Sequence, residues 1–263
     1  MGAPAEAGPG PPPVRYGGGR GARARRNAAE DLARAGQLEE DIAWLKAAVS
    51  PYSIELTPRA QDRLLAFARE LISWNSRLNL LSRSDAHNVI RKHVAASLGV
   101  FLAAQPAPRE KWIDVGTGGG FPGLVLKLVR PELDMTLLES SRKRCLFLEN
   151  VIRQVGAGPV PVLALRVETL LARGDGVGAY DLLTARAVAS LRDTLLQFGP
   201  LVTGGGRIIT FKGPAWQTEI EAVEQSGELA ASGFRLESVT RIPWALGHLL
   251  TLRRGAAADP PGA

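Results

Sequence analysis

The feature that most constrains this chain is a short apolar segment that runs into a glycine-dense turn, Lys111-Trp-Ile-Asp-Val-Gly-Thr-Gly-Gly-Gly-Phe-Pro-Gly123. Gly116, Gly118 and Gly120 allow the backbone to adopt positive φ and to approach a ligand with no Cβ in the way. Glu139 lies nineteen residues after Gly120, at the end of the next apolar run. A carboxylate at about this distance binds ribose hydroxyls in nucleotide-binding folds. The sequence therefore predicts a site for a nucleoside-containing cofactor.

From Lys111 onward, predicted strands alternate with predicted helices. The strands are expected at Trp112–Val115, Met135–Glu139, Val160–Leu165, Tyr180–Ala185, Arg207–Lys212, Arg235–Arg241 and His248–Arg253. Helices are expected after Phe121, Arg142, Ala189 and Ala215, and Pro122 suits the first turn of the first one. Such alternation requires right-handed crossovers and a mainly parallel sheet with helices on both faces. The short Ile242–Gly247 connection predicts that the last two strands form an antiparallel hairpin.

A seven-stranded, mainly parallel sheet that closes with an antiparallel hairpin is the layout of class I S-adenosylmethionine-dependent methyltransferases, an α/β, Rossmann-like fold. A dinucleotide dehydrogenase would need a second mononucleotide-binding half and usually a separate substrate domain. We therefore expect S-adenosyl-L-methionine as the cofactor, at the carboxyl ends of the strands beside the first one.

Composition divides the chain into four predicted parts. The first 26 residues are Gly, Pro, Ala and Arg with almost nothing to bury, which predicts disorder. A helical part begins near residue 57, because Thr57 suits the N-cap and Pro58 suits the first position of a helix. The parts are a disordered extension with a weak helix at 1–50, a small helical cap at 51–110, the methyltransferase domain at 111–254, and a frayed tail at 255–263.

Bulk properties bound the class of protein. Hydrophobic residues make up 45% of the 263 residues, and no apolar run approaches the roughly 18 residues that a membrane helix needs. The single cysteine, Cys145, excludes a disulfide or a cysteine zinc site within one chain. We expect a cytoplasmic protein with no metal and no membrane contact. The net charge of +6 favours an anionic binding partner.

Two carboxylates favour adenosylmethionine over a dinucleotide. Asp114 begins an Asp-x-Gly-x-Gly-x-Gly pattern, so its carboxylate is expected to face the cofactor's amino group and sulfonium. The alternative is a structural carboxylate that caps the turn. Glu168 follows the third strand, where an acidic residue usually contacts the adenine, and the alternative there is a solvated loop charge.

The motifs that the sequence lacks narrow the choice of methyl-acceptor atom. Methyl transfer requires alignment of nucleophile, methyl and sulfur, in a site that tolerates moving charge. Cys145 lies among Leu146, Phe147 and Leu148, which predicts a core position and disfavours a cysteine nucleophile. Thr184-Ala-Arg-Ala187 stands where exocyclic-amine methylases carry an Asp/Asn-Pro-Pro-aromatic motif. A ring nitrogen such as guanine N7 needs no general base, so it is consistent with the absence of these motifs. Many small-molecule acceptors are equally consistent with it.

Blocks along the chain, in order and spacing, resemble one family. They are Trp74-Asn-x-x-Leu-Asn-Leu-x-Ser82, Arg91-Lys-His-Val-x-x-Ser-Leu98, Asp114-Val-Gly-Thr-Gly-x-Gly-Phe-Pro-Gly123, Arg130-Pro131, Leu138-Glu-Ser-x-x-Lys-Arg144, Arg166-Val-Glu168, Arg186-Ala-x-Ala-Ser-Leu191, Phe211-Lys-Gly213 and His248-Leu249. From about Ser53 to Arg253 the chain resembles the bacterial glucose-inhibited division protein B family, the small-subunit rRNA guanine-N7 methyltransferases.

The resemblance implies a bacterial cytosolic enzyme that methylates N7 of a guanosine in the 530 loop of 16S rRNA. We expect a monomer whose partner is 16S rRNA or the 30S particle. The cofactor contacts that it implies are Gly116, Phe121, Val167, Glu168 and Arg186, to which the residues themselves add Asp114, Gly118 and Glu139. Arg186 is also expected beside the donor methyl, as a positioning residue. RNA contacts are expected from Arg91, Lys92, His93, Lys143, Arg144 and Lys212, because cationic side chains neutralise phosphates.

Several alternatives stay open. His93 also suits a core histidine, and Trp74 and Asn75 suit a purely structural role. Ala96 stands where the family usually has Asp, and Gly247 where it tends to have Arg, which leaves substrate details open. A methyltransferase for a small molecule or a protein, or a non-catalytic ribosome-assembly factor, remains a competing hypothesis.

Overall fold

The computed structural model describes residues 36–187 and 189–256. The chain divides into two compact units, Met1–Gln37 and Leu38–Ala263. The extension predicted over residues 1–26 lies outside the described residues, as does most of the predicted tail. A helix covers residues 36–49, and four side chains on one of its faces (Leu38, Ile42, Leu45 and Val49) are buried. The division at residues 50, 110 and 254 stays a prediction.

The described residues form one seven-stranded sheet with the order β3-β2-β1-β4-β5-β7-β6. The strands are β1 Lys111–Val115, β2 Asp134–Leu138, β3 Val162–Leu163, β4 Tyr180–Arg186, β5 Val202–Lys212, β6 Phe234–Arg241 and β7 His248–Arg254. The pairs among β1 to β5 are parallel, whereas β7 runs antiparallel to both β5 and β6. The predicted sheet and its closing hairpin are confirmed.

Two strands differ in length from the prediction by more than one residue. β3 is reduced to Val162–Leu163; Pro161, just before it, has no N–H to give to a ladder. β5 begins at Val202 rather than at Arg207, because Val202 already pairs with Tyr180 before a bulge in the β4–β5 ladder. The run Gly204–Gly206 concealed this early start, since glycines in a sequence suggest a turn.

The helices before the sheet follow the predicted start at Thr57, whose side chain accepts the Ala60 N–H at 3.2 Å. They are α2 Pro58–Leu78, α3 Arg83–His87, a π-helical turn Val89–Val94, α4 Ala95–Leu98 and α5 Val100–Ala103. Those that follow are α6 Gly123–Val129, α7 Arg142–Gln154, α8 Val167–Ala172, α9 Leu191–Asp193, α10 Trp216–Gln225 and α11 Glu228–Ala231. Pro122 is the N-cap of α6 rather than a residue of its first turn, and α8 was missed as a helix.

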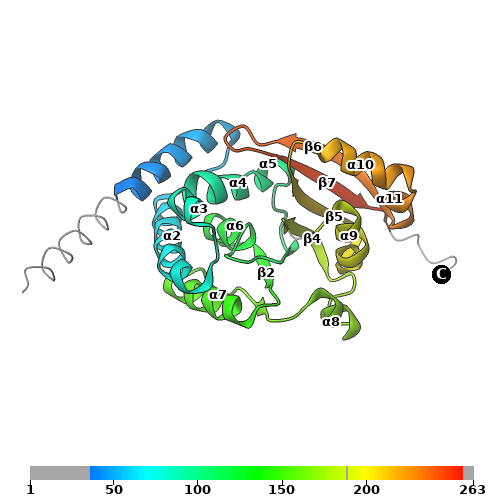
Figure 1. Ribbon diagram of the computed structural model, residues 1–263, viewed down its shortest axis with the longest axis horizontal. Coiled ribbons are helices and arrows are strands. Elements are labelled where there is room, and N and C mark those ends of the chain that lie inside the picture. The colour runs from blue at the N-terminus through cyan, green and yellow to red at the C-terminus, as the bar shows by residue number, and fades with distance from the viewer. Residues whose placement is uncertain (1–35, 188, 257–263) are drawn as a thin grey trace, which may run out of the picture. The chain divides into compact units, whose positions relative to one another are not determined.

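The sheet is covered on both faces (Figure 1). Alternate strand residues enter two separate clusters, because successive side chains of a strand point to opposite faces. Trp112 of β1 joins the cluster with α2, α4, α6 and α7 residues. Its neighbour Ile113 joins the cluster with α8, α9 and α10 residues.

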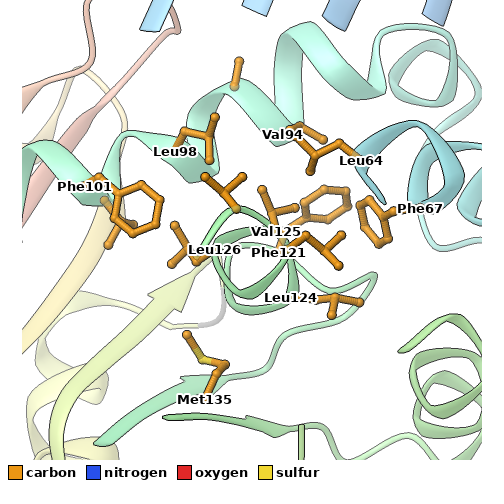
Figure 2. Packing of buried hydrophobic residues seen from close by; sticks show 14 of the residues in the cluster. Leu64, Phe67, Val94, Leu98, Phe101, Phe121, Leu124, Val125, Leu126 and Met135 are labelled. Carbon is orange, nitrogen blue, oxygen red and sulfur yellow. The ribbon is translucent and has the colours of Figure 1, made fainter. Parts of the chain in front are cut away.

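The helices before β1 pack directly on the glycine-dense turn and α6. Figure 2 shows Phe121 and Val125 facing Leu64 and Phe67 of α2 and Val94 of the π-helical turn. The Phe121 and Phe67 rings meet edge to face, with centroids 5.5 Å apart. The glycine-dense turn is therefore anchored by a side chain in the helical core, and the two regions share one apolar cluster.

Candidate functional site

The glycine-dense turn follows β1 at the carboxyl end of the sheet. The Gly116 N–H donates to the Leu138 carbonyl at 2.8 Å, which ties the start of the turn to the end of β2. Gly116, Gly118 and Gly120 have φ of 69°, 56° and 94°, a region that other residues enter only with strain. A Cβ on Gly118 would find only the Gly116 carbonyl within 4 Å, at 3.9 Å, so this backbone faces open space.

Asp114 lies beneath the turn, with an exposed fraction of 0%. Its Oδ2 accepts the Gly123 N–H at 2.8 Å and its Oδ1 accepts the Thr184 hydroxyl at 2.8 Å. Burial raises the pKa of Asp114 to about 6, although these hydrogen bonds oppose the shift. A Cβ on Gly123 would come within 2.6 Å of the Asp114 Cβ, so only glycine fits there. These contacts are those of a carboxylate that caps the turn; its predicted contact with the cofactor stays a prediction.

Glu139 lies just after β2 and is buried. Its Oε2 accepts the Gly118 N–H at 3.0 Å, and its Oε1 accepts the Ser141 N–H at 2.8 Å. Arg144 approaches the same Oε2 at 3.8 Å. The carboxylate thus joins the turn to the start of α7, and each oxygen keeps a lone pair for a further donor.

A cavity of about 170 Å³ lies beside the turn. Gly116, Glu139, Val167 and Glu168 all line it, so the structure brings four predicted cofactor residues together. Val167 is buried at the start of α8, and Glu168 is exposed in the first turn of that helix. Four predicted residues lie outside this lining: Gly118 in the turn, Asp114 beneath it, Phe121 in the helical core and Arg186 at the end of β4.

A second cavity, of about 870 Å³, is lined by Arg91, Lys92, Arg186 and Lys212 among others. These four cations come from the π-helical turn and from the ends of β4 and β5. Ala189 lines both cavities, so they adjoin immediately after β4. This arrangement offers a small compartment of mixed apolar and charged lining next to a larger basic one.

Arg186 is half-buried at the end of β4. Its Cζ lies 6.0 Å from the Phe121 ring centroid and 5.5 Å from that of Phe211. The Arg186 Nη2 lies 3.0 Å from His93 Nδ1, and Nη1 donates to the His93 carbonyl at 3.4 Å. Burial lowers the pKa of Arg186, while Asp114 and Asp85 oppose that shift. The guanidinium stays charged, since an arginine side chain is not deprotonated in proteins.

The predicted RNA residues of the π-helical turn have partners within the protein. Arg91 donates from Nε to Asp41 Oδ1 at 2.6 Å and lies 4.7 Å over the Trp44 ring. Lys92 is exposed and pairs with Asp85. His93 does not line the basic cavity; it is largely buried behind it, against the Phe121 ring at 5.2 Å.

The other three predicted RNA cations differ in their surroundings. Lys212 is only 9% exposed; its Nζ lies 2.6 Å from Glu219 Oε2 and 3.5 Å from the Ala189 carbonyl. Arg144 faces Glu139, and Lys143 is exposed on α7. Neither Lys143 nor Arg144 belongs to the lining described for the basic cavity.

Sequence reasoning missed the aromatic part of the basic cavity. Trp44 and Trp244 line it, and the Trp244 Nε1–H donates to the Ala95 carbonyl at 2.8 Å. The helix with Trp44 carried only a weak apolar pattern, and Trp244 lies in the connection between two strands. The clue available was a tryptophan in a short loop beside a family block, since loops carry function more often than cores do.

The two positions that depart from the family pattern both line the basic cavity. Ala96 is buried there in α4. Gly247 has φ of 115°, and a Cβ on it would lie 3.2 Å from the Lys212 carbonyl. The backbone at Gly247 therefore adopts a conformation in which the arginine usual in the family would be strained.

Three further expectations concern chemistry outside this site. Cys145 is buried and its thiol donates to the Glu139 carbonyl at 3.2 Å; burial raises its pKa, so its predicted core position is confirmed. Within residues 36–187 and 189–256, no group of three or more His, Cys, Asp or Glu side chains is placed to hold a metal ion. Across the same described ranges, no helix is both long and apolar enough to cross a membrane.

Comparison with known proteins gives a consistent result. The family model for rRNA small subunit methyltransferase G matches residues 60–243. A protein of that name from Symbiobacterium thermophilum is 38% identical, over 79% of this chain and 82% of its own length. Another, from Moorella thermoacetica, is 36% identical over 68% and 75%.

Solved structures are more distant. The ribosomal protein L11 methylase of Lactobacillus delbrueckii subsp. bulgaricus is 22% identical, with a TM-score of 0.46 over 62% of this chain and 77% of that one. This likeness is too low to bear on the activity.

Proposed function

The chain belongs to the rRNA small subunit methyltransferase G family, and from this premise we propose that it transfers a methyl group from S-adenosyl-L-methionine to N7 of a guanosine in the 530 loop of 16S rRNA. The proposal places the enzyme in the bacterial cytoplasm, as a monomer, with 16S rRNA or the 30S particle as its partner. The observation that carries it is the meeting of the two cavities at Ala189, three residues after Arg186, which lines the larger one.

The small cavity has the features that the cofactor requires. Within its lining, Glu139 offers carboxylate oxygens suited to ribose hydroxyls. Gly118 lies outside the lining, and the open space over it admits a ligand against the backbone of the same turn. Val167 supplies an apolar surface for the adenine, with the Glu168 carboxylate beside it. S-adenosyl-L-methionine bound here would supply an electrophilic methyl group. Gly116, Gly118, Glu139, Val167 and Glu168 are the proposed cofactor-binding residues, with Phe121 and Asp114 supporting the turn.

The large cavity suits an anionic nucleotide. Arg186 lines it, and its charge can orient a phosphate or an oxygen of the base. Asp85 is paired with Lys92, and Glu219 with Lys212, so neither carboxylate is free to act as a general base. N7 of guanine carries an in-plane lone pair and no proton, so the acceptor needs no base. The paired carboxylates and the charged Arg186 are consistent with this acceptor.

The test is methyl transfer from labelled S-adenosyl-L-methionine to naked 16S rRNA and to 30S particles, followed by borohydride and aniline scission. N7-methylguanosine is cleaved by this treatment, so scission within the 530 loop is the expected result. Labelled RNA without scission there would contradict the N7 and 530-loop assignment. Label only in a protein or small-molecule fraction would favour a different acceptor. No label at all, together with rescue of a deletion strain by Arg186→Ala, would favour a non-catalytic assembly role.

A further inference from the structure

The Arg186 guanidinium is oriented by one residue of the helical region. Both hydrogen bonds that it makes within residues 36–187 and 189–256 go to His93: the Nη2–Nδ1 contact at 3.0 Å and the Nη1–carbonyl contact at 3.4 Å. An arginine at the end of a strand has several rotatable bonds, so its charge needs such partners to stay in one place.

Two aromatic rings complete the support. Phe121 lies 6.0 Å and Phe211 5.5 Å from the Arg186 Cζ, and the His93 ring packs against Phe121 with centroids 5.2 Å apart. The rings restrict where the guanidinium plane lies but give it no hydrogen-bond acceptor. The direction in which the guanidinium points is therefore determined by its hydrogen bonds to His93.

The contact also determines the protonation of His93. The guanidinium has only donors, so Nδ1 must accept, and the proton of the neutral ring then resides on Nε2. His93 Nε2 lies 3.4 Å from Asp85 Oδ2, and this carboxylate favours a proton on that nitrogen. Burial and the charge of Arg186 lower the pKa of His93 to about 4, so the ring is neutral at physiological pH.

The backbone of His93 is fixed as well. His93 lies in the π-helical turn Val89–Val94, and such turns often occur where a functional side chain is presented. Its carbonyl accepts the Ser97 hydroxyl at 2.7 Å as well as the weaker bond from Arg186. Val94, the next residue, is fully buried in the core, which fixes the position of the turn.

We propose that His93 is a positioning residue for methyl transfer, which holds the Arg186 guanidinium in the lining of the large cavity through its Nδ1 and its carbonyl. This role rests on the proposed function, because it assumes that Arg186 acts on the incoming nucleotide. It differs from the RNA contact and from the inert core histidine that the sequence suggested for His93. The residue contacts neither cavity and acts through Arg186.

Two substitutions at His93 distinguish its role as a hydrogen-bond acceptor for Arg186 from its role in packing against Phe121. His93→Phe keeps a ring against Phe121 but offers no acceptor at the Nδ1 position. His93→Asn loses most of the ring but places an amide oxygen near that position. His87→Phe is the matched control, because His87 is exposed on α3. Each variant is first compared with the wild type by thermal unfolding, so that loss of fold is separated from loss of positioning.

The kinetic readout is steady-state methylation of the rRNA substrate. We expect His93→Phe to lower kcat about 10- to 100-fold, because misplacing a positioning group by about 1 Å has effects of this size. KM for RNA should change less, since phosphate contacts elsewhere supply most RNA affinity. His93→Asn should restore kcat to within about tenfold of the wild type, although it packs worse than Phe. A merely structural histidine would give the opposite order.

The second readout needs no activity. The ¹⁵N shifts of the His93 ring should show an unprotonated Nδ1 and a protonated Nε2, and Arg186→Gln should shift the Nδ1 signal. A proton on Nδ1, or wild-type kcat in His93→Phe, would overturn the positioning role. A wild-type enzyme that does not methylate rRNA would instead overturn the proposed function and, with it, this role.

Discussion

The Asp114 carboxylate satisfies two donors in the core, the Gly123 N–H and the Thr184 hydroxyl. Asp114→Ala leaves both donors buried without an acceptor, at about 1–3 kcal/mol each. We expect the free energy of unfolding to fall by about 2–4 kcal/mol in urea denaturation. Asp114→Asn is the matched control: its amide keeps one acceptor, and the Thr184 hydroxyl can rotate to accept from the amide N–H. Equal stability of Asp114→Ala and the wild type would contradict the capping role.

The same carboxylate should make stability depend on pH. The pKa of Asp114 is raised by burial from 3.8 to about 6, so the folded state binds its proton more tightly than the unfolded state. Its contribution is therefore most favourable below pH 4 and is lost as the pH rises through 6. Relative to Asp114→Asn, the wild type should lose up to about 3 kcal/mol between these limits. Urea midpoints at several pH values measure this difference, and a flat difference would contradict the buried, protonatable carboxylate.

Gly118 shows how far a single position could be predicted from the sequence. Its spacing indicated a ligand-facing glycine, and the structure gives it φ of 56° with open space where a Cβ would be. The sequence indicated the capping of the turn by Asp114 only as an alternative. It did not indicate that Glu139 bonds the same turn, because that bond depends on strand register. Nor did it indicate that Lys212 pairs with Glu219, which lies in the next helix.

We expect Gly118→Val to abolish cofactor binding while the protein still folds. The left-handed backbone costs a branched residue about 1–2 kcal/mol, and the new side chain fills the space over the turn. Gly156→Val is the matched control, because Gly156 has φ of 59° and no atom within 4 Å of a Cβ. Both variants lose similar stability, so calorimetric titration with S-adenosyl-L-methionine isolates the steric effect. Wild-type affinity in Gly118→Val would remove this turn from the cofactor site.

At the scale of elements, hydrophobic periodicity and helix-capping residues predicted the segments that have a strong sequence pattern. Thr57 and Pro58 mark the start of α2, and the strand–helix alternation gave the sheet with its closing hairpin. α8 was missed because six residues are too few to show a helical period. The junction of the two cavities could not be predicted either, since it depends on how the end of β4 meets the π-helical turn.

The end of α2 offers a test of the structural interpretation of Asn75. Its Oδ1 accepts the Leu81 N–H at 2.7 Å and its Nδ2 donates to the Leu81 carbonyl at 3.1 Å, which closes the turn after the helix. Asn75→Ala removes both bonds, and we expect a loss of about 1–3 kcal/mol in the free energy of unfolding. Ser76→Ala, which removes one exposed bond to the Ser73 carbonyl, should cost less than about 0.5 kcal/mol. Comparable losses in the two variants would contradict the role of Asn75.

At the scale of the whole molecule, a net charge of +6 and a basic cavity should give RNA binding that weakens with salt. Only cations that release counterions from phosphates contribute to the slope of log affinity against log salt. The structure distinguishes two lysines, Lys143 and Lys212, that were both predicted from the sequence as RNA contacts. Lys143 is exposed on α7, whereas the Lys212 ammonium is largely buried against Glu219 at 2.6 Å.

We therefore expect Lys143→Ala to reduce the magnitude of the salt slope by about 0.7–0.9, the contribution of one phosphate contact. Lys212→Met should leave the slope unchanged and instead lower the thermal stability, because it leaves the Glu219 carboxylate beside Leu191 without its cation. Titration of labelled rRNA at several salt concentrations, with unfolding curves for each variant, measures both effects. A flattened slope in Lys212→Met would show that the ion pair opens on RNA binding, and would restore Lys212 as the phosphate contact that the sequence predicted.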